Sequence, residues 1–205
     1  MTEIYFVRHG ETNWNNLELC QGLTDIPLSE KGKNQAKQLG EILLKDHMQF
    51  DTYISSPLTR AIQTLEIIKK ILNDKKEIVI NNDFIERNFG TLEGKSFKKV
   101  TEVLESNTMQ EEIKGFETND TLSKRIYLGT LKLEKEYPNQ KILLVTHSNT
   151  IKGLMYYLTH GEFKFANPIP NLNVSKFTVN NQKIELNNLY LYTGLGTDKT
   201  CFKNF

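Results

Sequence analysis

The chain has 205 residues and a formal net charge of +1, a length that fits one domain spanning residues 1–205. Hydrophobic residues make up 38% and charged residues 25%, near the average of folded globular proteins, which argues against global disorder. No run of about 18 apolar residues and no basic excess is present, so we expect neither a membrane span nor a nucleic-acid partner. The N-terminal residues lack a secretory signal, and Cys20 and Cys201 form no disulfide framework, so we expect reduced thiols and a cytoplasmic location.

The basic residues are unevenly divided between lysine and arginine. Lysine supplies 22 of the 26, and the arginines are Arg8, Arg60, Arg87 and Arg125. The planar guanidinium binds carboxylate or phosphate through two parallel hydrogen bonds, whereas the lysine ammonium acts as a point charge. In a chain that uses lysine for ordinary positive charge, the arginines are the first places to look for an anion-binding site.

Short apolar runs alternate with helical periodicities along most of the chain. In chain order, the sequence predicts a strand at 3–7, a helix at 30–45, a strand at 51–54, a helix at 57–72, a strand at 77–80, a weaker helix at 96–104, a helix at 119–136, a strand at 142–145 and a helix at 149–159. Ser29, Ser56 and Ser148 are the expected N-caps of their helices. Residues 82–95 are expected to form a loop, and residues 105–117 a surface segment.

The pattern changes from helical to alternating after residue 173. Val174–Val179 and Gln182–Leu186 alternate around Asn180-Asn181, which predicts a β-hairpin. The strands that alternate with helices earlier in the chain predict parallel βαβ units. We therefore expect an α/β fold, a three-layer α/β/α sandwich with a mostly parallel sheet and an antiparallel C-terminal edge. The hairpin either ends the sheet or pairs across a homodimer.

Two histidines and two arginines converge at one edge of this predicted sheet. His9 and His147 each follow a buried strand by two residues, at the edge where open α/β sheets bind ligands. Arg8 adjoins His9, and Arg60 lies near a helix N-terminus, where free N–H groups favour an anion. The ligand that suits this cationic set is a phosphoryl group.

The other basic residues have simpler explanations. Arg60 taken alone could form an ion pair on a helix surface. Arg125 lies in mid-helix with no motif around it and is predicted to be a surface charge. His47 and His160 lie in polar segments at helix ends, and we assign them no role.

Five segments of the sequence together resemble the signature of a known family. They are Phe6-Val-Arg-His-Gly-Glu-Thr-Asn-Trp-Asn15, Gln21-Gly-Leu-Thr-Asp-Ile-Pro-Leu-Ser-Glu-Lys-Gly32, Ser55-Ser-Pro-Leu-Thr-Arg-Ala-Ile-Gln-Thr64, Glu86-Arg-Asn-Phe-Gly-Thr-Leu-Glu-Gly94 and Val145-Thr-His-Ser148. In this order they resemble the motifs of the histidine phosphatase superfamily, in its phosphoglycerate mutase-like branch. The Arg-His-Gly tripeptide alone is a weak signal, whereas all five motifs in order are highly specific.

The resemblance implies a phosphomonoester hydrolase that acts through a phosphohistidine. His9 would be the nucleophile, which must be neutral to attack phosphorus, and Arg8 is expected to lower its pKa. Arg8, Arg60 and His147 would hold the phosphoryl oxygens and stabilise their charge. Glu86 would protonate the leaving oxygen and then activate water.

The resemblance also implies residues around this core. Asn15 and Gln21 match positions that line the phosphate pocket in relatives. Ser148 either hydrogen-bonds the phosphoryl group or caps its helix. Arg87 either contacts substrate or buttresses the loop that carries the acid. Since arginine and histidine supply the positive charge and no carboxylate cluster is present, we expect no metal site and no cofactor.

Phosphatases and mutases of this family share one core and differ in the fate of the phosphohistidine. A mutase excludes water and grips a carboxylate with further basic residues, including paired arginines. The interval between the acid loop, residues 86–94, and the second histidine contains one arginine, Arg125, and its first part, residues 95–115, contains Lys95, Lys98, Lys99 and Lys114. We therefore predict an open, hydrolytic pocket for a small phosphorylated metabolite, with a cofactor-dependent phosphoglycerate mutase as the alternative.

Two questions stay open at the level of sequence. Phe89, Phe97, Phe116 and Met109 either line the pocket or pack the loop onto the core. The substrate candidates are phosphosugars, 3-phosphoglycerate, a nucleotide-loop phosphate and phosphoserine. A non-catalytic module that binds phosphorylated partners is a further alternative, although such a module is expected to have lost the nucleophile or the acid, both of which are present.

Overall fold

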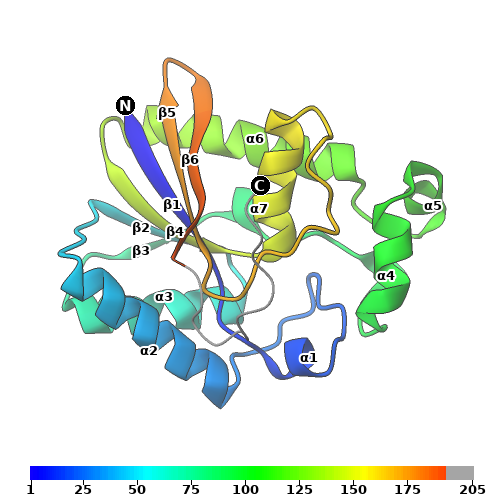
Figure 1. The fold of residues 1–205 in the computed structure, drawn as a ribbon, viewed down its shortest axis with the longest axis horizontal. Coiled ribbons are helices and arrows are strands. Elements are labelled where there is room, and N and C mark those ends of the chain that lie inside the picture. Colours follow the sequence, from blue (N-terminus) through cyan, green and yellow to red (C-terminus); the bar gives the residue numbers. More distant parts are fainter. Residues whose placement is uncertain (193–205) are drawn as a thin grey trace.

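The structure of this protein is a computed structural model that describes residues 1–192 (Figure 1), and Cys201 lies outside this range. Its strands are β1 (Thr2–Arg8), β2 (Thr52–Ser55), β3 (Ile78–Ile80), β4 (Lys141–Thr146), β5 (Val174–Asn180) and β6 (Lys183–Tyr192). Its helices are α1 (Asn13–Asn16), α2 (Glu30–Lys45), α3 (Thr59–Leu72), α4 (Phe97–Leu104), α5 (Asn107–Glu112), α6 (Asn119–Glu136) and α7 (Ser148–Leu158), with short 3-10 helices η1 (Asn82–Phe84) and η2 (Gly90–Leu92).

The strands form one six-stranded sheet in the order β3-β2-β4-β1-β5-β6. The pairs β1–β4, β2–β4 and β2–β3 are parallel, whereas β5 runs antiparallel to both β1 and β6. This topology confirms the predicted α/β fold with a mostly parallel sheet and an antiparallel C-terminal edge. In the described range, β6 is the edge strand on that side.

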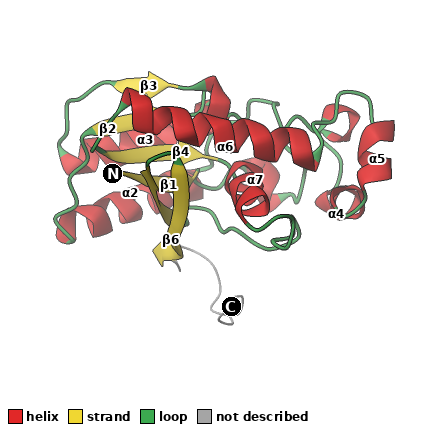
Figure 2. Ribbon diagram, turned by 90° about the horizontal axis from the view of Figure 1, so that it is seen from above, coloured by secondary structure: helices red, strands yellow, loops and turns green. Residues whose placement is uncertain are grey.

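Helices cover both faces of the sheet, as Figure 2 shows from above. Tyr5 of β1 belongs to a core with Leu39 of α2, whereas its neighbour Phe6 belongs to a second core with Ile126 of α6. Successive strand residues alternate in this way because their side chains point to opposite faces. The two cores confirm the three-layer sandwich. Within residues 1–192, none of the helices combines the length and the apolar character needed to cross a membrane.

The register of β1 and β4 determines where the polar residues after these strands lie. Arg8 and Thr146, the last residues of the two strands, are paired partners. His9 and His147 come next in the chain, so they leave the sheet side by side. On the other side of β4, Ser55 at the end of β2 pairs with Val145.

The start of α3 differs from the prediction. Ser56 does not cap this helix, which begins at Thr59 with Leu58 as its N-cap. The carboxylate of Asp25 accepts hydrogen bonds from the backbone N–H of Thr59 at 2.8 Å and from its hydroxyl at 2.6 Å. A carboxylate from a distant loop therefore accepts a free N–H of the helix N-terminus, and its negative charge interacts favourably with the positive end of the helix dipole.

Three other local features differ from the sequence prediction. α1 lies in the stretch between β1 and α2 for which no helix was predicted, and α5 lies in the predicted surface segment 105–117. The hairpin turn is formed by Asn181 and Gln182, one residue later than expected, and both have positive φ, 51° and 61°. Two consecutive left-handed residues are typical of a type I′ turn.

Candidate active site

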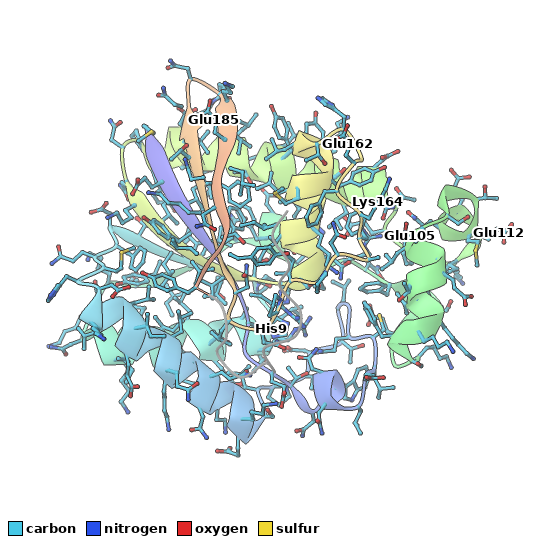
Figure 3. The ribbon with its side chains drawn as sticks, viewed as in Figure 1. His9, Glu105, Glu112, Glu162, Lys164 and Glu185 are labelled. Carbon is cyan, nitrogen blue, oxygen red and sulfur yellow. The ribbon has the colours of Figure 1, made fainter. Side chains whose placement is uncertain are left out.

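The carboxyl ends of β1 and β4 bring two histidines together. The ring centroids of His9 and His147 lie 5.1 Å apart, and both rings are buried. The His9 N–H donates to the carbonyl of Thr146 at 2.9 Å, which extends the β1–β4 ladder by one residue. Figure 3 shows His9 at the end of β1, where the chain leaves the sheet toward α1.

Hydrogen bonding holds the His9 ring in one tautomer. Its Nδ1 atom lies 2.7 Å from the carbonyl oxygen of Gly10. Because a carbonyl oxygen only accepts, Nδ1 carries the proton and Nε2 has the lone pair in the neutral ring. Asn171 Nδ2 also donates to the His9 carbonyl at 2.9 Å, which fixes the backbone. His9 therefore presents an unprotonated Nε2.

Two partners hold the ring of His147, one at each ring nitrogen. Arg60 Nε donates to His147 Nδ1 at 3.3 Å, and His147 Nε2 lies 2.6 Å from the hydroxyl of Ser56. Because a guanidinium only donates, Nδ1 is the acceptor and the ring proton is on Nε2. The ring is fully buried, behind the cavity described below.

Burial and nearby guanidiniums keep both rings neutral. Burial lowers the pKa of His9 well below its ordinary value, and the charges of Arg60 and Arg8 lower it further. The pKa of His147 is lowered well below its ordinary value by the same two causes, burial first and then Arg60. The expected effect of Arg8 on the His9 pKa is present, but burial and Arg60 contribute more.

Arg60 lies in the first turn of α3 and is fully buried. Its Nη1 donates to the carbonyl of Thr24 at 3.0 Å, and its Nη2 donates to the carbonyl of Gly22 at 2.7 Å. Gly22 has a φ of +59°, and a Cβ at this position would meet the carboxylate of Glu93. Arg60 is thus a fixed buried cation, and the explanation as a surface ion pair is wrong.

Arg8 lies at the end of β1. Its Nη1 donates to the carbonyl of Ile169 at 2.6 Å, whereas its buried Nε has no hydrogen-bond partner in the described part of the chain. Burial lowers the pKa of Arg8 to about 10, so the guanidinium is still charged at neutral pH. A half-buried guanidinium whose Nε–H has no partner within residues 1–192 is suited to an anionic ligand.

Glu86 follows η1 and is buried, with 6% of its surface exposed. Its Oε1 accepts from the backbone N–H of Arg87 at 2.9 Å. Its Oε2 accepts from the backbone N–H of Asn149 in the first turn of α7, at 3.5 Å. These contacts hold the carboxyl group beside the helix N-terminus at the wall of the cavity.

Arg8, His9, Arg60 and Glu86 line a cavity of about 620 Å³, whereas His147 is not among its lining residues. Of the residues predicted from the sequence, those that line it are Arg8, His9, Asn15, Gln21, Arg60, Glu86 and Ser148. Asn15 Oδ1 accepts from the Thr12 N–H at 3.0 Å, and Gln21 Oε1 is buried with no partner among residues 1–192. In the same range, no group of three or more His, Cys, Asp or Glu side chains is arranged to hold a metal.

The sequence matches one protein family over residues 4–191, the histidine phosphatase superfamily (branch 1). The chain belongs to this superfamily. It is 39% identical over 162 residues to the uncharacterized phosphatase PhoE of Bacillus subtilis, with 79% of this chain and 80% of that protein covered. It is 30% identical over 190 residues to a 2,3-bisphosphoglycerate-dependent phosphoglycerate mutase of Treponema denticola, with 75% and 76% covered.

Solved structures of the superfamily have the same fold as this histidine phosphatase. The phosphoserine phosphatase of Entamoeba histolytica in complex with 3-phosphoglyceric acid is 28% identical, with a TM-score of 0.81, and covers 94% of this chain and 98% of its own. A phosphoglycerate mutase from Bacillus anthracis gives the same TM-score of 0.81 at 24% identity, over 91% and 92% of the two chains, which is a similarity of fold. The family match, with a phosphatase among the relatives and a phosphoserine phosphatase among the similar structures, supports a phosphatase enzyme.

Arg87 of this histidine phosphatase supports the acid loop from outside the cavity. Its Nη1 donates to Asn119 Oδ1 at 2.8 Å and to the carbonyl of Glu117 at 3.3 Å. Its guanidinium carbon lies 4.2 Å from the ring centroid of Phe165 and 5.3 Å from that of Phe116. The ring contacts are cation–π interactions. Of the two alternatives for Arg87, this geometry fits the buttress.

The structure contradicts one of the two alternatives for Ser148, that it caps its helix. The N-cap of α7 is His147, whose own side chain makes no capping hydrogen bond. The interpretation of Ser148 as an N-cap is therefore wrong. Ser148 is instead the first residue of the helix, and it lines the cavity.

Arg125 is not a simple surface charge, and that prediction is wrong. It forms an ion pair with Glu117 at 2.8 Å and has 22% of its side chain exposed. It also donates to the carbonyl oxygens of Asp83 at 2.8 Å and Ile85 at 3.1 Å. Arg125 therefore joins α6 to the segment that leads into Glu86.

Two residues at the site were not found by the sequence argument. Glu93 accepts hydrogen bonds from the backbone N–H groups of Leu23 and Thr24, both at 2.9 Å, and so joins the loop that holds Arg60 to the acid loop. Its place in the motif that begins at Glu86 was the available signal. Lys152 lines the cavity from α7, and its spacing of four from Ser148 was the signal in its case.

The aromatic and lysine candidates divide between cavity and core. Phe89 and Phe97 line the cavity, whereas Phe116 packs edge-on against Phe89 with ring centroids 5.7 Å apart. Met109 is 40% exposed on α5 and does not line the cavity. Of the four lysines between residues 95 and 114, Lys98 lines the cavity.

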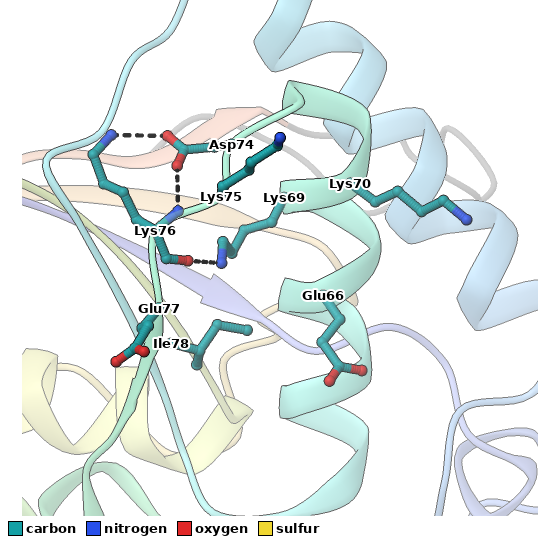
Figure 4. Close-up of a pocket in the computed structure, with 8 residues that line it drawn as sticks. All are labelled: Glu66, Lys69, Lys70, Asp74, Lys75, Lys76, Glu77 and Ile78. Carbon is teal, nitrogen blue, oxygen red and sulfur yellow. Dashed lines mark hydrogen bonds and ion pairs between the residues drawn. The ribbon is translucent and has the colours of Figure 1, made fainter.

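A second hollow of about 620 Å³ lies away from the histidines, beside the C-terminal end of α3 (Figure 4). It is lined by Glu66, Lys69, Lys70, Asp74, Lys75, Lys76, Glu77 and Ile78. Lys76 Nζ forms an ion pair with Asp74 at 2.9 Å, and Lys69 Nζ donates to the Lys76 carbonyl. Acidic and basic side chains line it together, so we assign this hollow no ligand.

Proposed function

We propose that this histidine phosphatase is a phosphomonoester hydrolase that acts through a phosphohistidine on His9. The observation that carries the proposal is the fixed tautomer of His9, which leaves Nε2 unprotonated. His9 lines the same cavity as Arg8, Arg60 and Glu86. The proposal includes no metal and no cofactor, because two guanidiniums supply the positive charge that a transferring phosphoryl group requires.

In the first step, Nε2 of His9 attacks phosphorus while the P–O bond to the alcohol breaks. Glu86, in its protonated form, gives its proton to the leaving oxygen. In the second step, water attacks the phosphohistidine and the N–P bond breaks. Glu86 takes a proton from this water, so inorganic phosphate leaves and both side chains return to their starting forms.

The remaining residues bind the phosphoryl group or position those that do. Arg8 and Arg60 hold its oxygens through charge-assisted hydrogen bonds. The phosphate pocket also includes Asn15, Gln21 and Ser148, with Arg87 supporting the acid loop. His147 positions Arg60 through the Nε–Nδ1 hydrogen bond of 3.3 Å, and its direct contact with the phosphoryl group stays a prediction.

Hydrolysis is favoured over the mutase reaction by what the basic residues contact. Arg125, the one arginine between the acid loop and the second histidine, is engaged by Glu117 and two backbone carbonyls. It therefore cannot grip a substrate carboxylate without breaking these contacts. The substrate is a small phosphorylated metabolite, a class supported by the phosphoserine and 3-phosphoglyceric acid bound to the Entamoeba histolytica enzyme.

p-Nitrophenyl phosphate, a generic monoester, tests the proposal. We expect turnover by the wild-type chain and its loss in His9→Ala, because no other lone pair replaces Nε2. Circular dichroism checks that the variant folds. Trapping of ³²P from a labelled monoester on the wild-type chain reports the phosphohistidine. Equal turnover by both proteins would rule out His9 as the nucleophile, and no turnover of any monoester would favour a non-catalytic binding module.

A further inference from the structure

A buried lysine beside the phosphoryl site has no part in the proposed reaction. Lys152 lies on α7 four residues after Ser148, which puts both side chains on one face of the helix. It lines the same cavity as Arg8 and Glu86, although only 4% of its surface is exposed. Lysine is rarely buried without a compensating group, so its position at the wall of a ligand cavity indicates a binding function.

The hydrogen bonds of Lys152 leave room for a ligand. Its Nζ donates to the carbonyl of Phe165 at 2.7 Å, the one acceptor that Lys152 has among residues 1–192. An ammonium has three hydrogens to donate, so two are available to a bound molecule. The carbonyl fixes the amine at the cavity wall and therefore favours one position for an incoming acceptor.

The charged groups that face Lys152 come from three parts of the fold. Arg8 on β1 and Arg87 on the acid loop lower its pKa, whereas Glu86 and Glu105 raise it. Burial is the largest cause, and the pKa is lowered to about 7. An anion beside the amine would favour its charged form, so binding of such a group and protonation of Lys152 support each other.

The cavity has more positive charge than one phosphate requires. The charged residues that line it are the basic Arg8, Arg60, Lys98 and Lys152 and the acidic Glu18 and Glu86. When Glu86 is protonated, as the first step requires, the four basic residues and Glu18 give the lining a net charge of +3. A phosphate ester dianion balances two of these charges, which leaves one for a further negative group on the substrate.

We propose that Lys152 forms a second anion subsite, which binds a carboxylate of the substrate while Arg8 and Arg60 bind its phosphate. This inference rests on the proposed function and narrows its substrates to small phosphorylated carboxylic acids. One ammonium with two available hydrogens matches one singly charged carboxylate. Because Lys152 reaches the cavity from α7, the carboxylate is recognised without further arginines between the acid loop and the second histidine.

3-Phosphoglycerate and glycerol 3-phosphate test this subsite. They share the phosphate ester and the neighbouring hydroxyl, and differ at C1, which is a carboxylate in one and a hydroxymethyl group in the other. Inorganic phosphate released by the full-length chain is measured at about pH 6, where the Lys152 amine is protonated. We expect kcat/KM to be about 10- to 100-fold higher for 3-phosphoglycerate, mainly through KM, as a charged hydrogen bond provides.

Lys152→Met removes the ammonium and keeps a side chain of similar length. We expect it to lower kcat/KM for 3-phosphoglycerate by about 10- to 100-fold and that for glycerol 3-phosphate by less than about threefold. Lys99→Met is the matched control, because Lys99 is an exposed lysine of α4 outside the cavity. We expect Lys99→Met to retain the wild-type preference.

The outcomes separate this inference from the proposed function. Equal losses for both substrates in Lys152→Met would mean that the lysine acts by holding the Phe165 carbonyl, and would overturn the subsite. A wild-type chain that hydrolyses p-nitrophenyl phosphate but has no preference for 3-phosphoglycerate over glycerol 3-phosphate would also overturn the subsite. This test needs no variant, so it does not depend on whether Lys152→Met folds. A wild-type chain that releases phosphate from no monoester would contradict the proposed function itself.

Discussion

His9 is a histidine whose surroundings oppose protonation. Free histidine has a pKa of about 6.5 and is mostly protonated at about pH 5. In this protein, burial and the charges of Arg60 and Arg8 hold the pKa of His9 well below that value. The Nε2 lone pair is therefore retained under mildly acid conditions.

This neutrality predicts the acid side of the pH profile. We expect kcat/KM for p-nitrophenyl phosphate to be retained down to about pH 5 once ionisation of the substrate is taken into account. Arg8→Met removes one positive neighbour and should raise the pKa of His9, which moves the acid limb to higher pH. A wild-type profile that falls tenfold per pH unit below about 6.5 would contradict the buried, neutral His9.

The four arginines do more than bind phosphate. Arg8 and Arg60 line the cavity. Arg87 donates to Glu117 and Asn119, and Arg125 donates to Glu117 and to the segment that leads into Glu86. In Arg60 and Arg125, one planar guanidinium reaches three different acceptor groups, which the single nitrogen of lysine cannot do with the same geometry. The bias between lysine and arginine therefore marks fixed, multi-donor positions as well as the anion site.

At the scale of elements, Arg125 of α6 determines how the acid segment is anchored. Arg125→Met leaves Glu117 and the carbonyls of Asp83 and Ile85 without this donor. We expect the free energy of unfolding to fall by about 2–4 kcal/mol, because hydrogen bonds to a charged, partly buried group are lost. Urea denaturation followed by circular dichroism measures this change, and kcat should fall with it because Glu86 follows Ile85 directly.

Lys132 provides the control on the same helix. It forms an ion pair with Asp83 at 2.9 Å, but 59% of its side chain is exposed. Exposed ion pairs contribute little, so Lys132→Met should leave the free energy of unfolding nearly unchanged. Equal effects of the two variants would show that Arg125 does not anchor the segment.

Local patterns predicted the strands, the longer helices and the strand-end position of His9 and His147, because each depends on neighbouring residues in the chain. The contacts of Arg125 and Glu93 could not be predicted in this way. Arg125 meets Asp83, 42 residues earlier, and Glu93 meets Leu23, 70 residues earlier. The cap of α3 was missed for the same reason, since Asp25 lies 34 residues before Thr59. Such pairings depend on the tertiary fold.

At the scale of the whole molecule, the order of strands assembles the site. β4 lies between β2 and β1, so the ends of three strands and the start of α7 surround one point. The segment after α7 completes the wall through three contacts, from Lys152 to Phe165, from Arg8 to Ile169 and from Asn171 to His9. Lys152, Arg8 and His9, which line the cavity, therefore also hold this wall in place. Through these contacts the segment after α7 is attached to the phosphoryl site.

This arrangement predicts the fate of the phosphohistidine. A mutase must keep its intermediate and exclude water, which requires a closed site and a strong grip on the substrate carboxylate. Here the lining includes the exposed side chains of Glu18, Phe97 and Lys98, so water reaches the cavity, and the one arginine of the interval is engaged elsewhere. With 3-phosphoglycerate as substrate, we expect inorganic phosphate and glycerate as the main products.

Phosphorus NMR of one reaction mixture measures both outcomes, because inorganic phosphate and 2-phosphoglycerate give separate signals. We expect phosphate to appear faster than 2-phosphoglycerate, with and without added 2,3-bisphosphoglycerate. If the grip on the carboxylate comes from Lys152 alone, Lys152→Met should slow phosphate release from 3-phosphoglycerate without making the isomer. Faster formation of 2-phosphoglycerate than of phosphate would instead identify a mutase, in which water is excluded from the phosphohistidine by a closure of the cavity around the bound substrate.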